Sequence, residues 1–98
     1  MSNPGRPQHG VVDAHGVQIH YARLTGGARP LVLLHGWPEF WLTWLPVMQR
    51  LAPRGYDVIA PDLRGFGDSD KPDFGPSDTV GADVHAADVL ALLDTLGL

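Results

Sequence analysis

The residues with the clearest chemical potential are His35-Gly36-Trp37-Pro38-Glu39, which directly follow the apolar run Leu31-Val32-Leu33-Leu34. A continuous apolar run of this length is typical of a strand buried on both faces. In open α/β sheets, ligands bind outside the carboxyl ends of such strands. Gly36 permits a backbone turn that other residues resist, and Pro38 fixes the loop because its φ angle is restricted. We therefore expect a sharply turned loop at the reactive edge of a sheet.

Other groups that could carry chemistry do not form a recognisable site. Gly65-x-Gly67 lacks the third glycine and the following helix of a phosphate loop, and Asp68-Ser69-Asp70 lacks the spacing of a calcium loop. The chain has no cysteine, so a thiolate metal site is excluded. Four further histidines do not pair at metal-ligand spacing: His9, His15, His20 and His85. We expect no metal site and no cofactor.

The composition is that of a small globular domain, with 98 residues, 44% hydrophobic and 18% charged. The net charge is −4 and the basic residues are scattered, which argues against a nucleic-acid or anionic-membrane partner. No apolar run approaches the roughly 20 residues of a membrane span. Residues 1–9 are polar and do not resemble a signal peptide, so we expect a flexible tail there, a domain over residues 10–98, and a cytoplasmic location.

The elements that position the loop follow from hydrophobic periodicity. Residues 11–13 and 17–22 predict two strands joined by a turn at His15-Gly16, the second half-buried because apolar residues alternate with Gln18 and His20. Residues 56–60 predict a further buried strand.

Two helices are predicted from the remaining periodic segments. The first has Thr43 as its N-cap and Pro46 in its first turn, and it ends at Pro53-Arg54-Gly55. The second follows the N-cap candidates Ser77, Asp78 and Thr79 and stops at Gly97. Its apolar residues cover more than one stripe, which predicts a well-buried helix. They are Val84, Ala87, Leu90, Ala91, Leu92, Leu93 and Leu96.

The predicted order is β-β-β-α-β-α, an α/β arrangement with a mixed, mostly parallel sheet. A βαβ unit requires a closing strand, and no strand is predicted after the last helix. We therefore expect the N-terminal part of a larger α/β domain, truncated before the next strand.

The loop at His35-Gly36-Trp37-Pro38 and the loop Gly65-Phe66-Gly67-Asp68-Ser69 together resemble the α/β-hydrolase fold. More narrowly they are similar to its branch of epoxide hydrolases and haloalkane or haloacetate dehalogenases. The resemblance implies that a carboxylate attacks carbon to form an ester, which a His-activated water then hydrolyses without a cofactor. It also implies that the backbone N–H of Trp37 serves as an oxyanion donor. The implied substrate is a small epoxide or organohalide.

Around Trp37, the resemblance points to His35 as a supporting loop residue and to Pro38, Glu39 and Trp41 as substrate-binding residues. Purely structural roles for the same residues are an alternative. His35 would tie the loop to neighbouring backbone, Glu39 would be a helix-start charge, and Trp41 a core aromatic. A second group resembles a surface network that shapes the other loop: Asp62, Arg64, Asp68 and Ser69.

The nucleophile elbow of the family, Gly-x-Asp/Ser-x-Gly, does not occur in these 98 residues, and neither do its later acid and catalytic His. We expect the chain alone to be inactive. Epoxide hydrolase and dehalogenase are not separated by the residues present, and a serine esterase is a further alternative. A rival of another class is a non-catalytic truncated product or a split half that needs a partner chain. In either case the strand at 31–34 would be an unpaired apolar edge and favour self-association.

Overall fold

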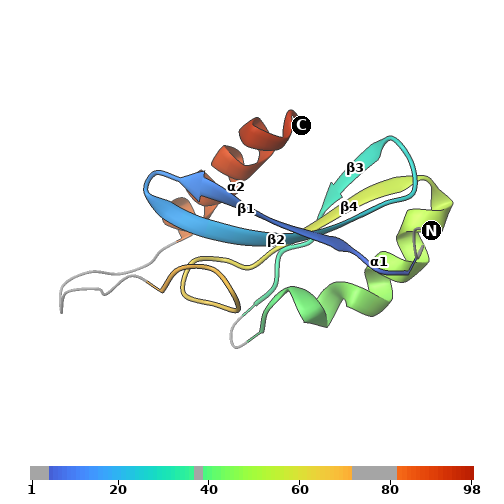
Figure 1. Cartoon of the computed structure of the whole chain (residues 1–98), viewed down its shortest axis with the longest axis horizontal. Coiled ribbons are helices and arrows are strands. Elements are labelled where there is room, and N and C mark those ends of the chain that lie inside the picture. Colours follow the sequence, from blue (N-terminus) through green and yellow to red (C-terminus); the bar gives the residue numbers. More distant parts are fainter. Residues whose placement is uncertain (1–4, 37–38, 72–81) are drawn as a thin grey trace.

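The computed structural model describes residues 5–36, 39–71 and 82–98. Four strands form one sheet in the order β1-β2-β4-β3. Helices α1 and α2 lie on opposite faces of this sheet (Figure 1). The α/β class and the element order predicted from the sequence are confirmed.

Strands β1 (Gln8–Ala14) and β2 (Val17–Thr25) form an antiparallel hairpin whose register ends at the pair Ala14 and Val17. The two turn residues are His15, with φ 53°, and Gly16, with φ 90°. Positive φ at both positions is the requirement of the two-residue turn that matches strand twist, so the predicted hairpin is confirmed. Strand β1 begins at Gln8, whereas the predicted tail extended to residue 9. Backbone pairing of Gln8 and His9 with β2 accounts for the difference.

Strand β4 (Tyr56–Pro61) lies between β2 and β3 (Arg29–Val32). It pairs antiparallel with β2 and parallel with β3. The sheet is mixed, as predicted, but two of the three pairings among the described residues are antiparallel, so "mostly parallel" is wrong for this part. The reason is that the described residues contain one β-α-β crossover, whereas β2 runs antiparallel to both of its neighbours, β1 and β4.

Two apolar clusters cover the two faces of the sheet. Ala22, Val58 and Ala60 pack against Met48 of α1, whereas Ile19 and Ile59 pack against Leu92 of α2. Strand β2 is therefore buried on both faces over much of its length, and the prediction of a half-buried strand is wrong. Its polar residue His20 is 6% exposed because a buried polar network, described below, encloses it.

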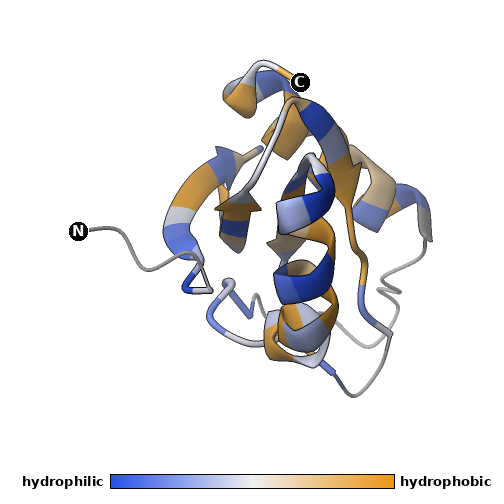
Figure 2. Ribbon diagram, turned by 90° about the vertical axis from the view of Figure 1, so that its right-hand side faces the viewer, coloured by the Kyte–Doolittle hydropathy of each residue, from blue (hydrophilic) through white to orange (hydrophobic). Residues whose placement is uncertain are grey.

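The segment between β3 and β4 is helical in three short pieces, η1 (Trp41–Trp44), α1 (Leu45–Leu51) and η2 (Ala52–Arg54). Figure 2 shows hydrophobic and hydrophilic residues interleaved along this segment, the pattern of a helix that packs by one side. Pro46 lies in the first turn of α1, as predicted. The N-cap of α1 is Trp44 without a side-chain cap, so the prediction of Thr43 is wrong. The 3-10 helix η1 runs directly into α1, so α1 begins without a side-chain cap.

Helix α2 (Ala82–Leu96) is followed by Gly97 at φ 74°, the predicted stop. The N-cap candidates Ser77, Asp78 and Thr79 lie outside the described residues. Leu92 is fully buried, but Leu90 is 61% exposed, so the helix is covered on one side only and is not well buried as predicted. No helix among the described ranges is long and apolar enough to cross a membrane.

Strand β3 pairs with β4 alone among the described residues and therefore lies at the edge of the sheet. The strand occupies Arg29–Val32 rather than residues 31–34, and the Leu33 N–H extends the pairing to the Ile59 carbonyl at 2.9 Å. Leu34 is 48% exposed. The unpaired edge strand predicted from the sequence is therefore present among the described residues, and the apolar residue Leu34 follows its end.

Candidate functional site

The loop after β3 is tied to the loop after β4 through His35. Leu63 donates its backbone N–H to Nε2 of His35 at 3.0 Å, and the opposite ring nitrogen, Nδ1, donates to the Gly36 carbonyl at 3.0 Å. The ring of Phe66 lies edge-on at 5.1 Å between centroids. His35 is 5% exposed. These contacts use both ring nitrogens for backbone, which supports the interpretation of His35 as a structural tie.

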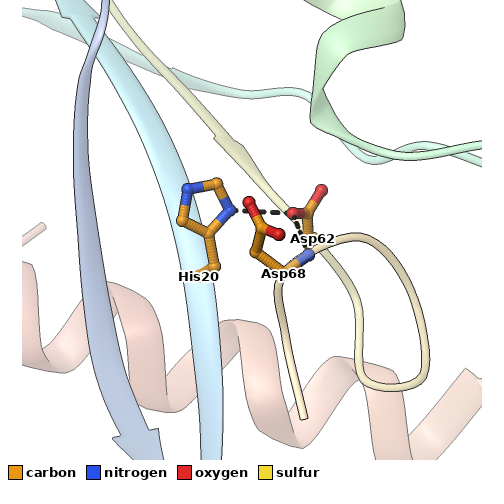
Figure 3. A group of neighbouring side chains, drawn as sticks. All are labelled: His20, Asp62 and Asp68. Atoms are coloured by element: carbon orange, nitrogen blue, oxygen red, sulfur yellow. Dashed lines mark hydrogen bonds and ion pairs between the residues drawn. The ribbon is translucent and has the colours of Figure 1, made fainter. Parts of the chain in front are cut away.

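Asp62, at the end of β4, is the centre of a second set of contacts. One carboxylate oxygen, Oδ1, accepts the Trp41 N–H at 2.7 Å. The other, Oδ2, accepts the His20 Nδ1–H at 2.8 Å and the Asp68 N–H at 3.0 Å. In Figure 3, dashed lines join one oxygen of the Asp62 carboxylate to the His20 ring and to the backbone nitrogen of Asp68. One buried carboxylate thus connects β2, the start of η1 and the loop after β4.

Ser69 completes this connection. Its hydroxyl donates to the Asp62 carbonyl and accepts the His20 backbone N–H at 2.9 Å, while Asp62 N–H donates to the His20 carbonyl at 2.8 Å. The sequence predicted a surface network for this group. That is wrong for Asp62 and Ser69, which are 0% and 2% exposed. They are buried because the loop lies alongside β2 and is hydrogen-bonded to it at Gln18 and His20. Asp68 has an exposed side chain.

Arg64 joins the same loop to α2 by a bidentate ion pair. Its Nε and one terminal nitrogen each lie 2.8 Å from a carboxylate oxygen of Asp88. The hydrogen bonds to Asp88 raise the pKa of Arg64 above its ordinary value. Asp88 is 1% exposed, and reasoning from the sequence did not single it out. The sequence did offer one sign of a buried ion pair, because Asp88 is a charged residue among the apolar positions of α2.

The predicted substrate-binding residues lie as follows. Trp37 and Pro38 are outside the described residues. Glu39 has an exposed side chain, and its N–H closes a turn on the Gly36 carbonyl at 2.8 Å. Trp41 is half-buried and packs against the apolar cluster on the α1 face, which supports the core-aromatic interpretation.

His9 and His20 lie side by side, a contact that their spacing in the sequence did not indicate. Nδ1 of His9 lies 2.8 Å from Nε2 of His20, and the rings are stacked at 5.0 Å. The hairpin register explains this, because His9 pairs with Ala22 and so lies diagonally across from His20 on the same face. A separation of 11 residues gives no such sign in the sequence.

The ligand atoms of His20, Asp62 and Asp68 all lie within 4.8 Å of one another, close enough to share a metal ion. However, both ring nitrogens of His20 and both oxygens of Asp62 already have hydrogen-bond partners. A bound cation would have to displace donors that point at the same atoms. We therefore describe this group as a hydrogen-bonded network.

Comparison with known families agrees with this arrangement of sheet and loops. Residues 29–98 match the family described as alpha/beta hydrolase fold. The chain belongs to this family. The loops that follow the parallel strands β3 and β4, which are joined through His35 and Asp62, are therefore loops of an α/β hydrolase.

Among curated relatives of this α/β hydrolase is epoxide hydrolase 2 of Siraitia grosvenorii, 42% identical over 93 residues, which cover 93% of this chain and 28% of that protein. The soluble epoxide hydrolase of Corynebacterium sp. (strain C12) is 46% identical over 83 residues, covering 85% of this chain and 27% of that protein. The chain thus spans less than a third of the length of these relatives.

Solved structures give the same result. The α/β-hydrolase chain superposes on the epoxide hydrolase CorEH with a TM-score of 0.82 at 42% identity, covering 94% of this chain and 30% of that one. The Vigna radiata epoxide hydrolase VrEH1 gives a TM-score of 0.84 at 35% identity, covering 99% and 31%. The sheet and helices described above are therefore the N-terminal part of this fold.

Proposed function

We propose that this chain is the N-terminal part of an epoxide hydrolase, an enzyme that opens epoxides by water through an ester on a carboxylate nucleophile. The observation that carries the proposal is the identity of 42% and 46% to epoxide hydrolases over nearly the whole chain. The substrates of such a reaction are small molecules. Forming and hydrolysing an ester on an enzyme carboxylate needs no cofactor.

The proposed contribution of this chain is the oxyanion side of the site. The loop after β3 is held at the carboxyl edge by His35, and the Asp62 carboxylate holds Trp41, four residues beyond Trp37. A loop anchored on both sides of Trp37 suits a backbone donor, because such a donor is effective only when it is fixed before charge develops. We propose the N–H of Trp37 as that donor, with Pro38, Glu39 and Trp41 beside the substrate.

The proposed reaction also needs a nucleophile, an acid and a catalytic His, and these 98 residues contain no motif for them. The matched part covers 28% of the Siraitia grosvenorii relative. Dehalogenation and ester hydrolysis are the competing activities. The relatives named above are epoxide hydrolases, which favours epoxide opening.

A chimera tests the proposal. This chain replaces the matched segment of the Corynebacterium enzyme, and the product is assayed with an epoxide, a haloalkane and an aryl ester. We expect epoxide turnover within about tenfold of the parent enzyme. A folded chimera that hydrolyses only the haloalkane or the ester would overturn the proposal, and so would one without any turnover.

Within that chimera, Trp37→Ala and Trp37→Pro form a matched pair. Alanine keeps the backbone N–H and proline removes it. Loss of one oxyanion donor costs about 10²–10³ in kcat. We expect that loss for the proline variant only. Equal losses in both variants would show that the side chain, and not the amide, is what matters.

Self-association through the β3 edge and a cytoplasmic location belong to the same proposal. The free edge and the exposed Leu34 support the first.

A further inference from the structure

We propose that His20, held between Asp62 and His9, is a positioning residue for the loop that begins at His35. The effect on turnover rests on the proposed function. The effect on the loop itself does not, because it follows from the contacts of the described residues.

The hydrogen positions follow from the partners. A carboxylate can only accept, so the hydrogen bond between Asp62 Oδ2 and His20 Nδ1 places a proton on that nitrogen. In the neutral ring the other nitrogen, Nε2, then carries a lone pair and accepts the Nδ1–H of His9. The outer nitrogen of His9, Nε2, is left as the acceptor that faces outward. Asp62, His20 and His9 thus form one directed chain of hydrogen bonds.

This chain supports the anchor on Trp41. The side chain of Asp62 is 0% exposed, so each N–H that it accepts replaces water it has lost. His20 supplies one of the two donors on Oδ2 and fixes the carboxylate plane, which aims Oδ1 at the Trp41 N–H. The His9 ring packs edge-on against the Trp41 ring at 4.8 Å. Removing the His20 ring therefore frees the carboxylate that holds η1.

His9 is the part of the chain open to solvent. Its side chain is exposed, and it lines a surface cavity of about 370 Å³ together with Arg6, Trp41 and Gln49. The outer end of the hydrogen-bond chain therefore lies at the surface, whereas its inner end at Asp62 is buried.

The test uses ¹⁵N NMR of the 98-residue chain. The two readouts are the rate of hydrogen exchange at the Trp41 amide and the ¹⁵N signals of the histidine ring nitrogens, which show which nitrogen carries the proton. Three variants are compared: His20→Gln, His20→Phe and His9→Gln. His15→Asn is the matched control, because His15 is an exposed turn histidine at φ 53°, a conformation that asparagine tolerates.

We expect His20→Phe to speed exchange at the Trp41 amide by about tenfold or more, the scale of a lost charge-assisted hydrogen bond. Gln can also donate to Asp62, so His20→Gln should restore slow exchange. His9→Gln keeps a donor for Nε2 of His20 and should leave the Trp41 amide close to the parent value, and His15→Asn changes nothing. The proposal is overturned if neutral His20 carries its proton on Nε2, or if His20→Phe leaves exchange at the Trp41 amide unchanged.

In the chimera, the same variants separate positioning from plain stability. His20→Phe is expected to lower kcat about tenfold with little change in KM, and His20→Gln to recover kcat. Equal effects of His20→Gln and His20→Phe on kcat would contradict the positioning role. An inactive parent chimera refutes the proposed function, and the NMR readouts still decide the role of His20.

Discussion

Leu63 donates its backbone N–H to Nε2 of His35 at 3.0 Å, and this bond joins the loops that follow two neighbouring parallel strands. The donor is fixed at the end of β4 and the acceptor just beyond β3. A histidine at this position thus holds the backbone on which the proposed oxyanion donor is carried.

Replacing His35 with Phe should loosen this junction. The ring contact with Phe66 can persist, but the Leu63 N–H loses its acceptor. An unsatisfied buried donor costs about 1–3 kcal/mol, and because Leu63 is half-buried we expect a loss of about 1 kcal/mol in urea unfolding. Faster hydrogen exchange at Leu63 should accompany it. An unchanged Leu63 amide would show that the bond does not hold the loop.

Gly67 and Gly65 offer a matched pair for the second loop. Both have positive φ, 54° and 90°, but a Cβ on Gly67 would meet the Asp62 carboxylate at 2.3 Å, whereas a Cβ on Gly65 meets nothing within 4 Å. Gly65→Ala should cost about 1–2 kcal/mol from backbone strain alone. Gly67→Ala should cost more and also speed exchange of the Trp41 amide. Equal effects on unfolding and on Trp41 would count against a role for this close approach.

Asp88→Ala should detach α2 from the loop. The Asp88 side chain is 2% exposed and that of Arg64 16%, so the variant leaves a largely buried guanidinium unpaired. Removing one partner of a buried pair costs about 3 kcal/mol or more. Asp94→Ala, at an exposed position of the same helix, is the control and should be close to neutral. Chemical denaturation of the two variants gives the comparison.

Stability should fall in acid partly through Asp57. The hydrogen bond from Arg23 lowers the pKa of Asp57, and a second from Thr25 adds to it. A carboxyl with a lowered folded-state pKa stabilises the protein above its ordinary pKa, and this contribution is lost as pH falls through the lowered value. We expect the urea midpoint of Asp57→Asn to vary less between pH 7 and about pH 2 than that of the parent chain. Asp94→Asn should follow the parent curve; a parallel curve for Asp57→Asn would contradict this assignment.

Leu34→Lys should weaken self-association. Leu34 ends the free edge strand and is 48% exposed, and a lysine on an edge opposes pairing with another chain. The control is Leu42→Lys, in η1, where Leu42 is 46% exposed but lies away from the edge. Sedimentation velocity should show association of the parent chain and of the control, and about tenfold weaker association of Leu34→Lys. A monomeric parent chain would rule out the proposed edge contact.

The local elements of this α/β hydrolase could be predicted from the sequence because their causes are local. Alternating or continuous apolar residues predict the strands, a His-Gly pair the hairpin turn, and glycines the ends of both helices. The loop at His35 could be placed at the sheet edge because it follows an apolar run. The start of β1 differed by three residues and both ends of β3 by two, because backbone pairing rather than side-chain pattern decides where a strand ends.

Tertiary structure alone decided which polar residues meet. His20 and Asp62 are 42 residues apart, and Arg64 and Asp88 are 24 apart, so no local pattern relates them. Each of these side chains fits equally well on a solvated surface when the sequence is considered by itself. Packing of two helices on opposite faces of the sheet removed water from these positions, and a buried charge or ring nitrogen must then find a partner within the fold. That requirement, imposed by burial, produced the network that holds the loops.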